Sequence, residues 1–156
     1  MYKHILVPVD GSQLSSHASQ KAVALAHSLD ARITFLYVQP DYPRPIVGEG
    51  TLIAPENREE FLRSTEEVAN TILNDAEHLA KASAVNASRL TEVSDTPWEV
   101  ITRTAVAQQC DLIFMASHGR RGLASLLIGS ETNKVLTHTT IPVLVYRESK
   151  TAQQEP

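Results

Sequence analysis

The sequence predicts one α/β domain: a doubly wound, five-stranded parallel sheet in strand order 3-2-1-4-5, with helices on both faces. Its 156 residues are enough to bury a single core. Short runs of β-branched and other apolar residues alternate with longer stretches of helical periodicity, as in parallel sheets joined by crossover helices. Such crossovers are right-handed, and if three strands wind outward the fourth returns beside the first. We expect residues 1–147 to form the domain and residues 148–156 a flexible polar tail.

The first unit is a strand over residues 5–9, whose apolar run ILVPV is closed by the turn-forming triplet Asp10-Gly11-Ser12. A helix over residues 14–29 follows, because apolar side chains recur there every three or four residues. These side chains are Leu14, Ala18, Ala22, Leu25 and Leu29. The run ARITFLYV, residues 31–38, is rich in β-branched and aromatic residues and predicts the second strand.

A proline-rich segment, residues 39–57, separates the second strand from the longest helical pattern. A connection of this length is uncommon unless it is functional or mobile, and whether it closes over a ligand is left open. The helix is expected over residues 56–83, followed by a third strand over residues 88–93. One helical face carries Phe61, Thr65, Val68, Ile72, Ala76 and Leu79.

The last part of the chain predicts two more helices and two more strands. Thr96-Pro97-Trp98-Glu99 matches a capping box with proline at the first helical position, and the helix should run to Gln109. Trp98 is expected to pack this helix onto the sheet. The remaining elements are a strand over residues 112–116, a short helix over residues 131–138 and a fifth strand over residues 142–146.

Composition narrows the classes of function. A formal net charge of −4 argues against a general nucleic-acid binder, which has a surplus of basic residues. Cys110 is the only cysteine, so no intrachain disulfide can form, and we expect it to be a small buried residue. The histidines show no metal-binding spacing. No stretch has the length of a signal peptide's apolar region or of a membrane span, and a cytoplasmic location is expected.

Two polar loops should meet where the strand order reverses, between the first and fourth strands. Ligands bind there in doubly wound sheets. The loops begin with VDGS and ASHG, and the second contains Gly119 and leads to Gly129-Ser130 at the start of the short helix. Glycine lets the backbone approach a phosphate, and a helix N-terminus attracts one. The other interpretation is purely structural: Gly119 turns the chain, Ser130 caps its helix and Asp10 caps the first helix. The standard nucleotide-loop motifs are absent.

Four segments decide between these interpretations through a resemblance. They are ILVPVDGS, DLIFMASHGRRGL, LLIGSETNKVL and IPVLVYR. The chain resembles the universal stress protein family, UspA type, over nearly its whole length. The nucleotide-binding branch of that family carries G-x2-G-x9-G-[ST]. Gly119 and Gly129-Ser130 match this pattern, and Ala116 stands where its first glycine belongs.

The resemblance implies a regulatory protein of the stress response that binds ATP, ADP or AMP with little turnover, and no catalytic residue. Asp10 would contact ribose or adenine, and Mg²⁺ would bridge the phosphates. The resemblance also implies a homodimer formed by the last strand, through Val143, Leu144 and Val145. The implied nucleotide site comprises Pro8, Val9, Asp10, Val38, Met115, Ala116, Ser117, His118, Gly119, Arg120, Gly129, Ser130, Glu131 and Thr132.

Three other functions remain in competition. The first is a slow nucleotide hydrolase or transferase that uses His118 and Arg120. The second is a phospho-acceptor module with Asp10 as acceptor, which fits less well because such modules need an acidic cluster at the first strand and a lysine after the fifth. The third is an interaction dimer that has lost nucleotide binding, an alternative that depends on Ala116.

Overall fold

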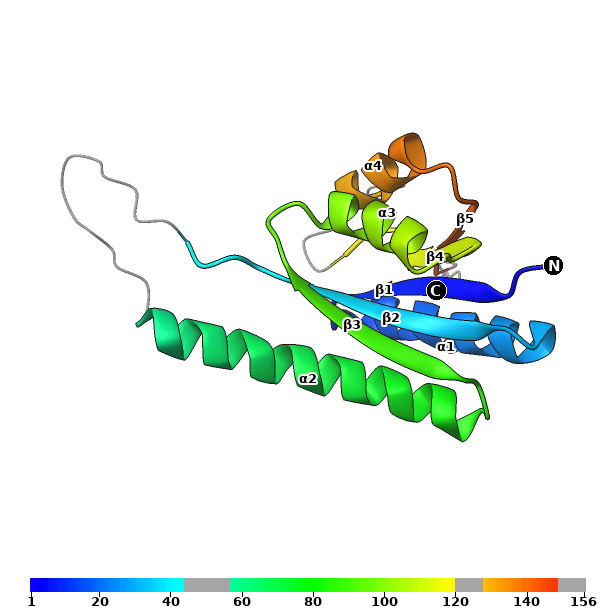
Figure 1. Cartoon of the computed structure of the whole chain (residues 1–156), viewed down its shortest axis with the longest axis horizontal. Helices are drawn as coiled ribbons and strands as arrows, with labels where there is room; N and C mark the ends of the chain where they lie inside the picture. The colour runs from blue at the N-terminus through cyan, green and yellow to red at the C-terminus, as the bar shows by residue number, and fades with distance from the viewer. Residues whose placement is uncertain (44–56, 120–127, 149–156) are drawn as a thin grey trace, which may run out of the picture.

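The computed structural model describes residues 1–43, 57–119 and 128–148. Within them lies a five-stranded parallel sheet in the order β3-β2-β1-β4-β5, which confirms the predicted fold class (Figure 1). The element order is β1(His4–Val9), α1(Gln13–Leu29), β2(Arg32–Gln39), α2(Arg58–Ala82), β3(Ala87–Val93), α3(Pro97–Ala107), β4(Leu112–Ala116), α4(Ser130–His138) and β5(Val143–Tyr146). Most of the predicted boundaries are met to within one or two residues.

The helices cover the sheet on both faces, with α1 and α2 on one side and α3 and α4 on the other (Figure 1). Alternate residues of each strand therefore enter two different cores. In β1, Ile5 and Val7 pack with α1 and α2, whereas Leu6 packs with α3 and α4. The central strands are buried on both faces, which explains why they read as continuous apolar runs.

The predicted apolar face of α2 is only partly correct. Val68 is exposed, and the buried positions include Ala69 and Leu73 instead. The buried stripe is thus rotated by about one residue from the predicted face, and most of its members are alanines packed in the core.

The predicted capping box at α3 is correct in position, with Thr96 as the N-cap and Pro97 as the first helical residue, but wrong in its hydrogen bonds. The Thr96 hydroxyl does not cap the helix backbone; it lies 3.3 Å from the Glu99 carboxylate, while the Thr96 N–H donates to Ser94 Oγ. The missing cap comes from another helix, because Glu131 of α4 accepts the Trp98 N–H at 2.9 Å. A partner more than thirty residues away cannot be read from the four-residue pattern.

Two residues with predicted packing roles behave as expected. Cys110 is buried, and burial raises the pKa of its thiol to about 11, so the thiol stays protonated at neutral pH. Trp98 packs against the core on the α3 side and also contacts the ring of His138, at a centroid distance of 4.5 Å. No helix in the described ranges is long and apolar enough to span a membrane.

A chain of three polar side chains, of which His4 and Thr34 are buried, crosses the amino end of the sheet. His4 Nε2 lies 2.8 Å from Thr34 Oγ1, which lies 3.0 Å from Ser88 Oγ, so β1, β2 and β3 are joined. Burial, followed by the charge of Arg32, lowers the pKa of His4, and the backbone of Gln108 and the Asp111 carboxylate offset this only in part.

We expect this histidine to make folding pH-dependent. The unfolded chain binds the proton near the ordinary pKa of about 6.5, more tightly than the folded chain does, so the free energy of unfolding should fall as the pH drops below that value. Denaturant titrations between pH 8 and 5.5 should measure this free energy of unfolding. It should fall more steeply with decreasing pH in the wild type than in His4→Gln. His78→Gln, at an exposed position of α2, is the control and should follow the wild type. Parallel curves for His4→Gln and the wild type would contradict this prediction.

Candidate functional site

The two loops predicted to meet do lie together at the carboxyl ends of β1 and β4. These strands are hydrogen-bonded neighbours, with Ile5 opposite Leu112. Gly119 passes so close to Asp10 that a Cβ at position 119 would lie 2.7 Å from Asp10 Oδ2. A side chain at position 119 would displace this carboxylate, so the glycine favours the close approach of the two loops.

Asp10 also organises the start of α1. Its Oδ1 accepts the Ser12 N–H at 2.9 Å in an Asx turn, and its own N–H donates to Ser15 Oγ. The cap of α1 is Ser12, whose hydroxyl accepts from the Ser15 N–H. The expectation that Asp10 caps α1 is therefore wrong, because Asp10 forms an Asx turn just before the helix and Ser12 is the cap. The other oxygen of the Asp10 carboxylate is the one near Gly119.

Ser117 connects β4 to both β5 and α4 through its backbone. Its N–H donates to the Tyr146 carbonyl at 2.8 Å, and its carbonyl accepts the Gly129 N–H at 2.7 Å. A Cβ at position 129 would lie 3.1 Å from both Cα and Cβ of His118. The glycine at 129 thus allows the start of α4 to pack on this loop. Its predicted role in the approach of a phosphate stays a prediction.

The N-terminus of α4 has no side-chain cap. Its N-cap is Gly129, in extended conformation, and Ser130 is the first helical residue, so the expectation that Ser130 caps the helix is wrong. The backbone N–H groups of the first helical turn have no partner within the helix. Those of Ser130, Glu131 and Thr132, together with the helix dipole, can receive an anion.

The Thr132 side chain has a structural contact. Thr132 is 2% exposed, and its hydroxyl donates to the Ala116 carbonyl at 3.0 Å. This bond ties the first turn of α4 to the last residue of β4. Thr132 therefore has its backbone N–H to offer a ligand, since its hydroxyl proton is already used.

Ala116, which replaces the first glycine of the motif, directs its methyl group away from α4. The methyl packs against the core on the α1 and α2 face, whereas Met115 lies in the core beneath α3 and α4. The Cβ at position 116 therefore occupies the opposite face of the sheet from the start of α4.

The strand ends near the switch point offer an apolar surface. Val38 and Met115 belong to the core on the α3 and α4 side, and strand alternation places Pro8 on that same face. Val9 lies in the other core. A flat apolar ligand at this end of the sheet would meet Pro8 and Val38, which are only partly buried.

His118 is partly buried, and its Nδ1 lies 3.2 Å from Ser117 Oγ. Arg120, the remaining predicted site residue, lies outside the described residues, as do Arg121 and Gly122. Within the described ranges, no group of three histidine, cysteine or acidic side chains could hold a metal ion.

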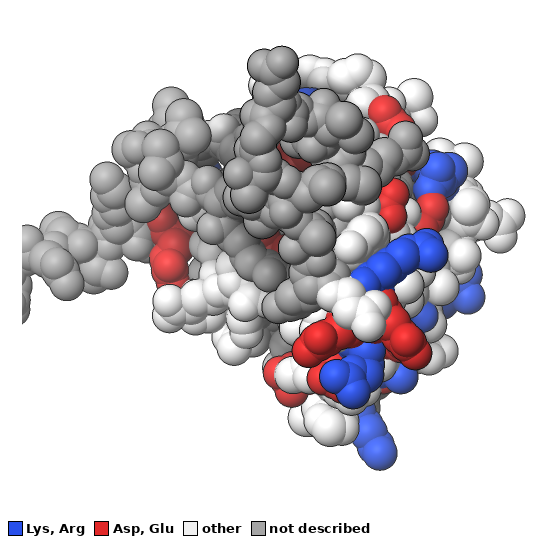
Figure 2. Space-filling model, turned by 90° about the vertical axis from the view of Figure 1, so that its left-hand side faces the viewer, with Lys and Arg blue, Asp and Glu red and all other residues white. Residues whose placement is uncertain are grey.

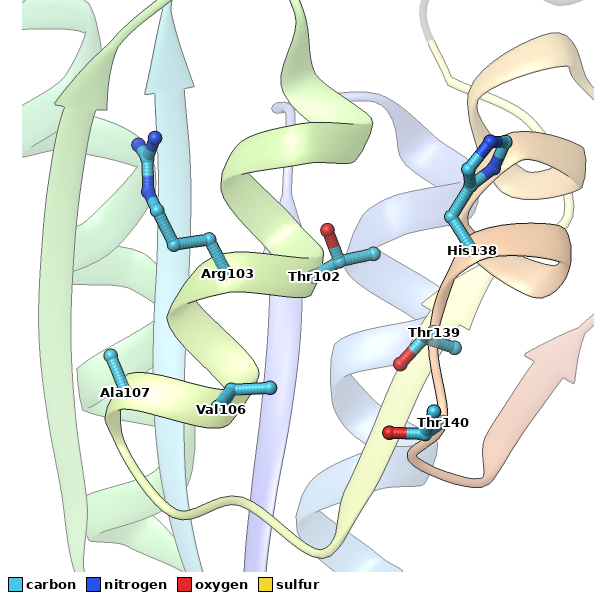
Figure 3. A pocket seen from close by; sticks show the side chains of 7 residues that line it. All are labelled: Thr102, Arg103, Val106, Ala107, His138, Thr139 and Thr140. Atoms are coloured by element: carbon cyan, nitrogen blue, oxygen red, sulfur yellow. The ribbon is translucent and has the colours of Figure 1, made fainter.

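Charge and shape at the surface provide two further observations. Figure 2 faces the end of the molecule at which the carboxyl ends of the strands lie. Among the described residues in this view, acidic and basic side chains lie next to one another. An open groove of about 460 Å³ lies between α3 and the end of α4, lined by Arg103, Val106 and His138 among others (Figure 3). It contains none of the predicted site residues.

Sequence reasoning missed two contributors to this arrangement. One is Tyr146, whose carbonyl accepts the Ser117 N–H, and the other is Trp98, whose N–H donates to the Glu131 carboxylate. Both contribute backbone atoms, for which residue type gives no signal.

Comparison with known proteins gives a family for this arrangement. The sequence model described as "Universal stress protein family" matches residues 1–147. The chain belongs to the universal stress protein family. Universal stress protein MJ0531 of Methanocaldococcus jannaschii is 30% identical over 154 residues, which cover 96% of this chain and 85% of that relative.

Solved structures of the family share this fold. The protein MJ0577 of Methanocaldococcus jannaschii matches with a TM-score of 0.81 at 25% identity, over 97% of this chain and 99% of that one. A universal stress protein in complex with cAMP has a TM-score of 0.69 at 23% identity, over 95% and 99% of the two chains. A family protein from Arabidopsis thaliana with AMP bound has a TM-score of 0.65 at 18% identity, over 94% and 93%.

Proposed function

We propose that this universal stress protein binds an adenine nucleotide at the carboxyl ends of β1, β2 and β4. The observation that carries the proposal is the placement of the uncapped N-terminus of α4 beside the β1–β4 switch point. Two close approaches accompany this placement, that of Gly119 to Asp10 and that of Gly129 to His118. A helix N-terminus at the switch point of a doubly wound sheet is suited to phosphate.

The remaining atoms can be assigned to parts of the nucleotide. The base would lie on the apolar ends of β1 and β2, at Pro8 and the backbone of Val38, and Asp10 would accept a hydrogen bond from the ribose or the base. The phosphates would take N–H groups of Gly119 and of the first turn of α4, with Ser117 and His118 beside them. A Mg²⁺ ion would bind mainly to the phosphates, since it retains water and needs few protein ligands.

The complexes named above support an adenine nucleotide as the ligand, because proteins of the same fold hold cAMP and AMP. The direction of the Ala116 methyl adds support, because the group lies on the far face of the sheet from α4. The alternative of a dimer that has lost nucleotide binding therefore gains nothing from the Ala116 substitution.

The proposed role is regulatory binding in a stress response with little intrinsic turnover. A hydrolase or transferase would need a group that activates water or an acceptor, and His118 is the candidate for that role. Measurement of product formation from ATP separates the two functions. We expect slow or no turnover, and a rate lost in His118→Ala would favour the enzyme.

Thermal unfolding tests the binding proposal directly. At about 100 times the dissociation constant, AMP or Mg-ATP should stabilise the fold by about 2.7 kcal/mol. For a domain of this size the melting temperature should rise by several degrees. Adenosine, which lacks phosphate, is the control and should raise it much less. The proposal fails if millimolar ATP, ADP and AMP all leave the melting temperature unchanged.

We also propose that β5 pairs with its copy in a second chain to form a homodimer. β5 is the last strand of the sheet, and within the described residues it pairs only with β4. Its residues, Val143–Tyr146, carry no charge. The opposite edge strand, β3, carries Arg89 and Glu92, which form ion pairs with Glu77 and Arg103. Charges of this kind protect an edge from pairing, and an uncharged edge favours it.

A further inference from the structure

Glu131 lies in the first turn of α4 and joins the starts of two helices. Its Oε2 accepts the Trp98 N–H of α3 at 2.9 Å, and its Oε1 lies 3.2 Å from Lys134 Nζ. The carboxylate is 40% exposed. One negative charge is therefore held between the N-termini of α3 and α4, beside the proposed phosphate site.

This contact completes the hydrogen bonding at the start of α3. Pro97 has no N–H, Trp98 donates to Glu131, and the N–H groups of Glu99 and Val100 both donate to the Thr96 carbonyl. The start of α3 thus has no N–H left to offer a phosphate. The start of α4, with Ser130, Glu131 and Thr132, must bind the anion without help from α3.

The same carboxylate engages a cation next to the site. Lys134 is one turn further along α4, and its ammonium is drawn to Glu131. Each phosphate added to a nucleotide brings more negative charge to this place. Each added phosphate is therefore repelled by the carboxylate and attracted only weakly by a lysine that is already paired. The favourable electrostatic contribution of each phosphate to the binding free energy is reduced as a result.

We propose that Glu131 is a specificity-determining residue that favours nucleotides with one phosphate, AMP or a cyclic mononucleotide, over ATP. This inference rests on the proposed nucleotide site. In that site the Glu131 carboxylate acts through its negative charge and through its ion pair with Lys134, while the Glu131 backbone N–H remains a donor to the phosphate. The carboxylate opposes ATP most because ATP carries the largest negative charge of these ligands.

Glu131→Gln isolates the charge, because the amide oxygen can still accept the Trp98 N–H. Dissociation constants for AMP and ATP should be measured by calorimetry without divalent cations, at low salt. We expect the ratio of the ATP to the AMP dissociation constant to fall by about three- to tenfold in the variant. The change should shrink near 1 M salt, where charges are screened within about 3 Å. The double variant Glu131→Gln/Lys134→Met should recover part of the wild-type ratio, because the lysine freed by the first substitution is then absent.

Glu77→Gln is the matched control. Glu77 is 36% exposed and lies 3.6 Å from Arg89 on the other face of the sheet, so it resembles the Glu131–Lys134 pair in exposure and pairing. This variant should leave the ratio unchanged. Suppose that both nucleotides bind to the wild type. If Glu131→Gln then leaves the ratio of the ATP to the AMP dissociation constant and its salt dependence unchanged, or changes both affinities equally, the inference is wrong while the proposed function stands. If the wild type binds neither nucleotide, the proposed function itself is overturned.

Discussion

Gly129→Val is expected to remove nucleotide binding while the protein remains folded. The new Cβ would lie 3.1 Å from Cα and Cβ of His118 and 3.3 Å from the Ser117 carbonyl, and the branched methyl groups add to the crowding. The start of α4 must then move away from the end of β4, which breaks the 2.7 Å bond from the Gly129 N–H to Ser117. Overpacking of this kind costs about 1–3 kcal/mol of stability. Calorimetry with AMP should show at least a tenfold weaker affinity.

A control must separate lost binding from lost stability. Ala105→Val overpacks a fully buried position of α3 in the same core, next to Cys110 and away from the strand ends. It should lower the melting temperature to a similar degree and keep the stabilisation by AMP. Gly129→Ala, with a single methyl group, should fall between the wild type and Gly129→Val. Wild-type affinity for AMP in Gly129→Val would show that α4 is not the phosphate-binding element.

Leu144→Lys is expected to convert a dimer into monomers. Light scattering at micromolar concentration should give the wild type a mass near twice the 17.1 kDa of one chain, and the variant a mass near that of one chain. The physical reason is that a charge at the centre of the uncharged strand β5 opposes edge-to-edge pairing.

Leu136→Lys provides the matched comparison. Leu136 and Leu144 are both 39% exposed, but Leu136 lies on α4. Its substitution should leave the mass of the dimer unchanged, and circular dichroism should show both variants folded. A wild type with the mass of one chain would remove the proposed dimer, and equal effects of both substitutions would assign the interface to a different surface.

Much of the fold could be predicted because local periodicity reports which face of an element is buried. The apolar run at β4 predicted its bounds correctly, and the alternation of strands and helices predicted the sheet order. The loops after β1 and β4 were predicted to meet, since parallel neighbours end at the same edge. Gly119 and Asp10 do meet there.

The errors arose where a local pattern had a distant partner. The Thr96–Glu99 pattern predicted a cap within α3, and Glu131 supplies it from α4. Ser130 was predicted to be the N-cap of α4, but Gly129 is the N-cap. A side chain at position 129 would crowd His118. In the first case a carboxylate from another helix replaces the expected cap, and in the second case packing against His118 favours a glycine at the cap position.

The sequence by itself determined the α/β class, the strand order and the family, and it predicted where along the chain a nucleotide site would lie. Only the tertiary structure decided what each site residue faces. It placed the Ala116 methyl on the α1 side, tied the Thr132 hydroxyl to β4 and set Glu131 between two helix starts. The physical reason is that hydrophobic periodicity depends on neighbours in sequence. The direction and partner of a polar side chain at a helix start depend instead on strand register and on the packing of segments far apart in the chain.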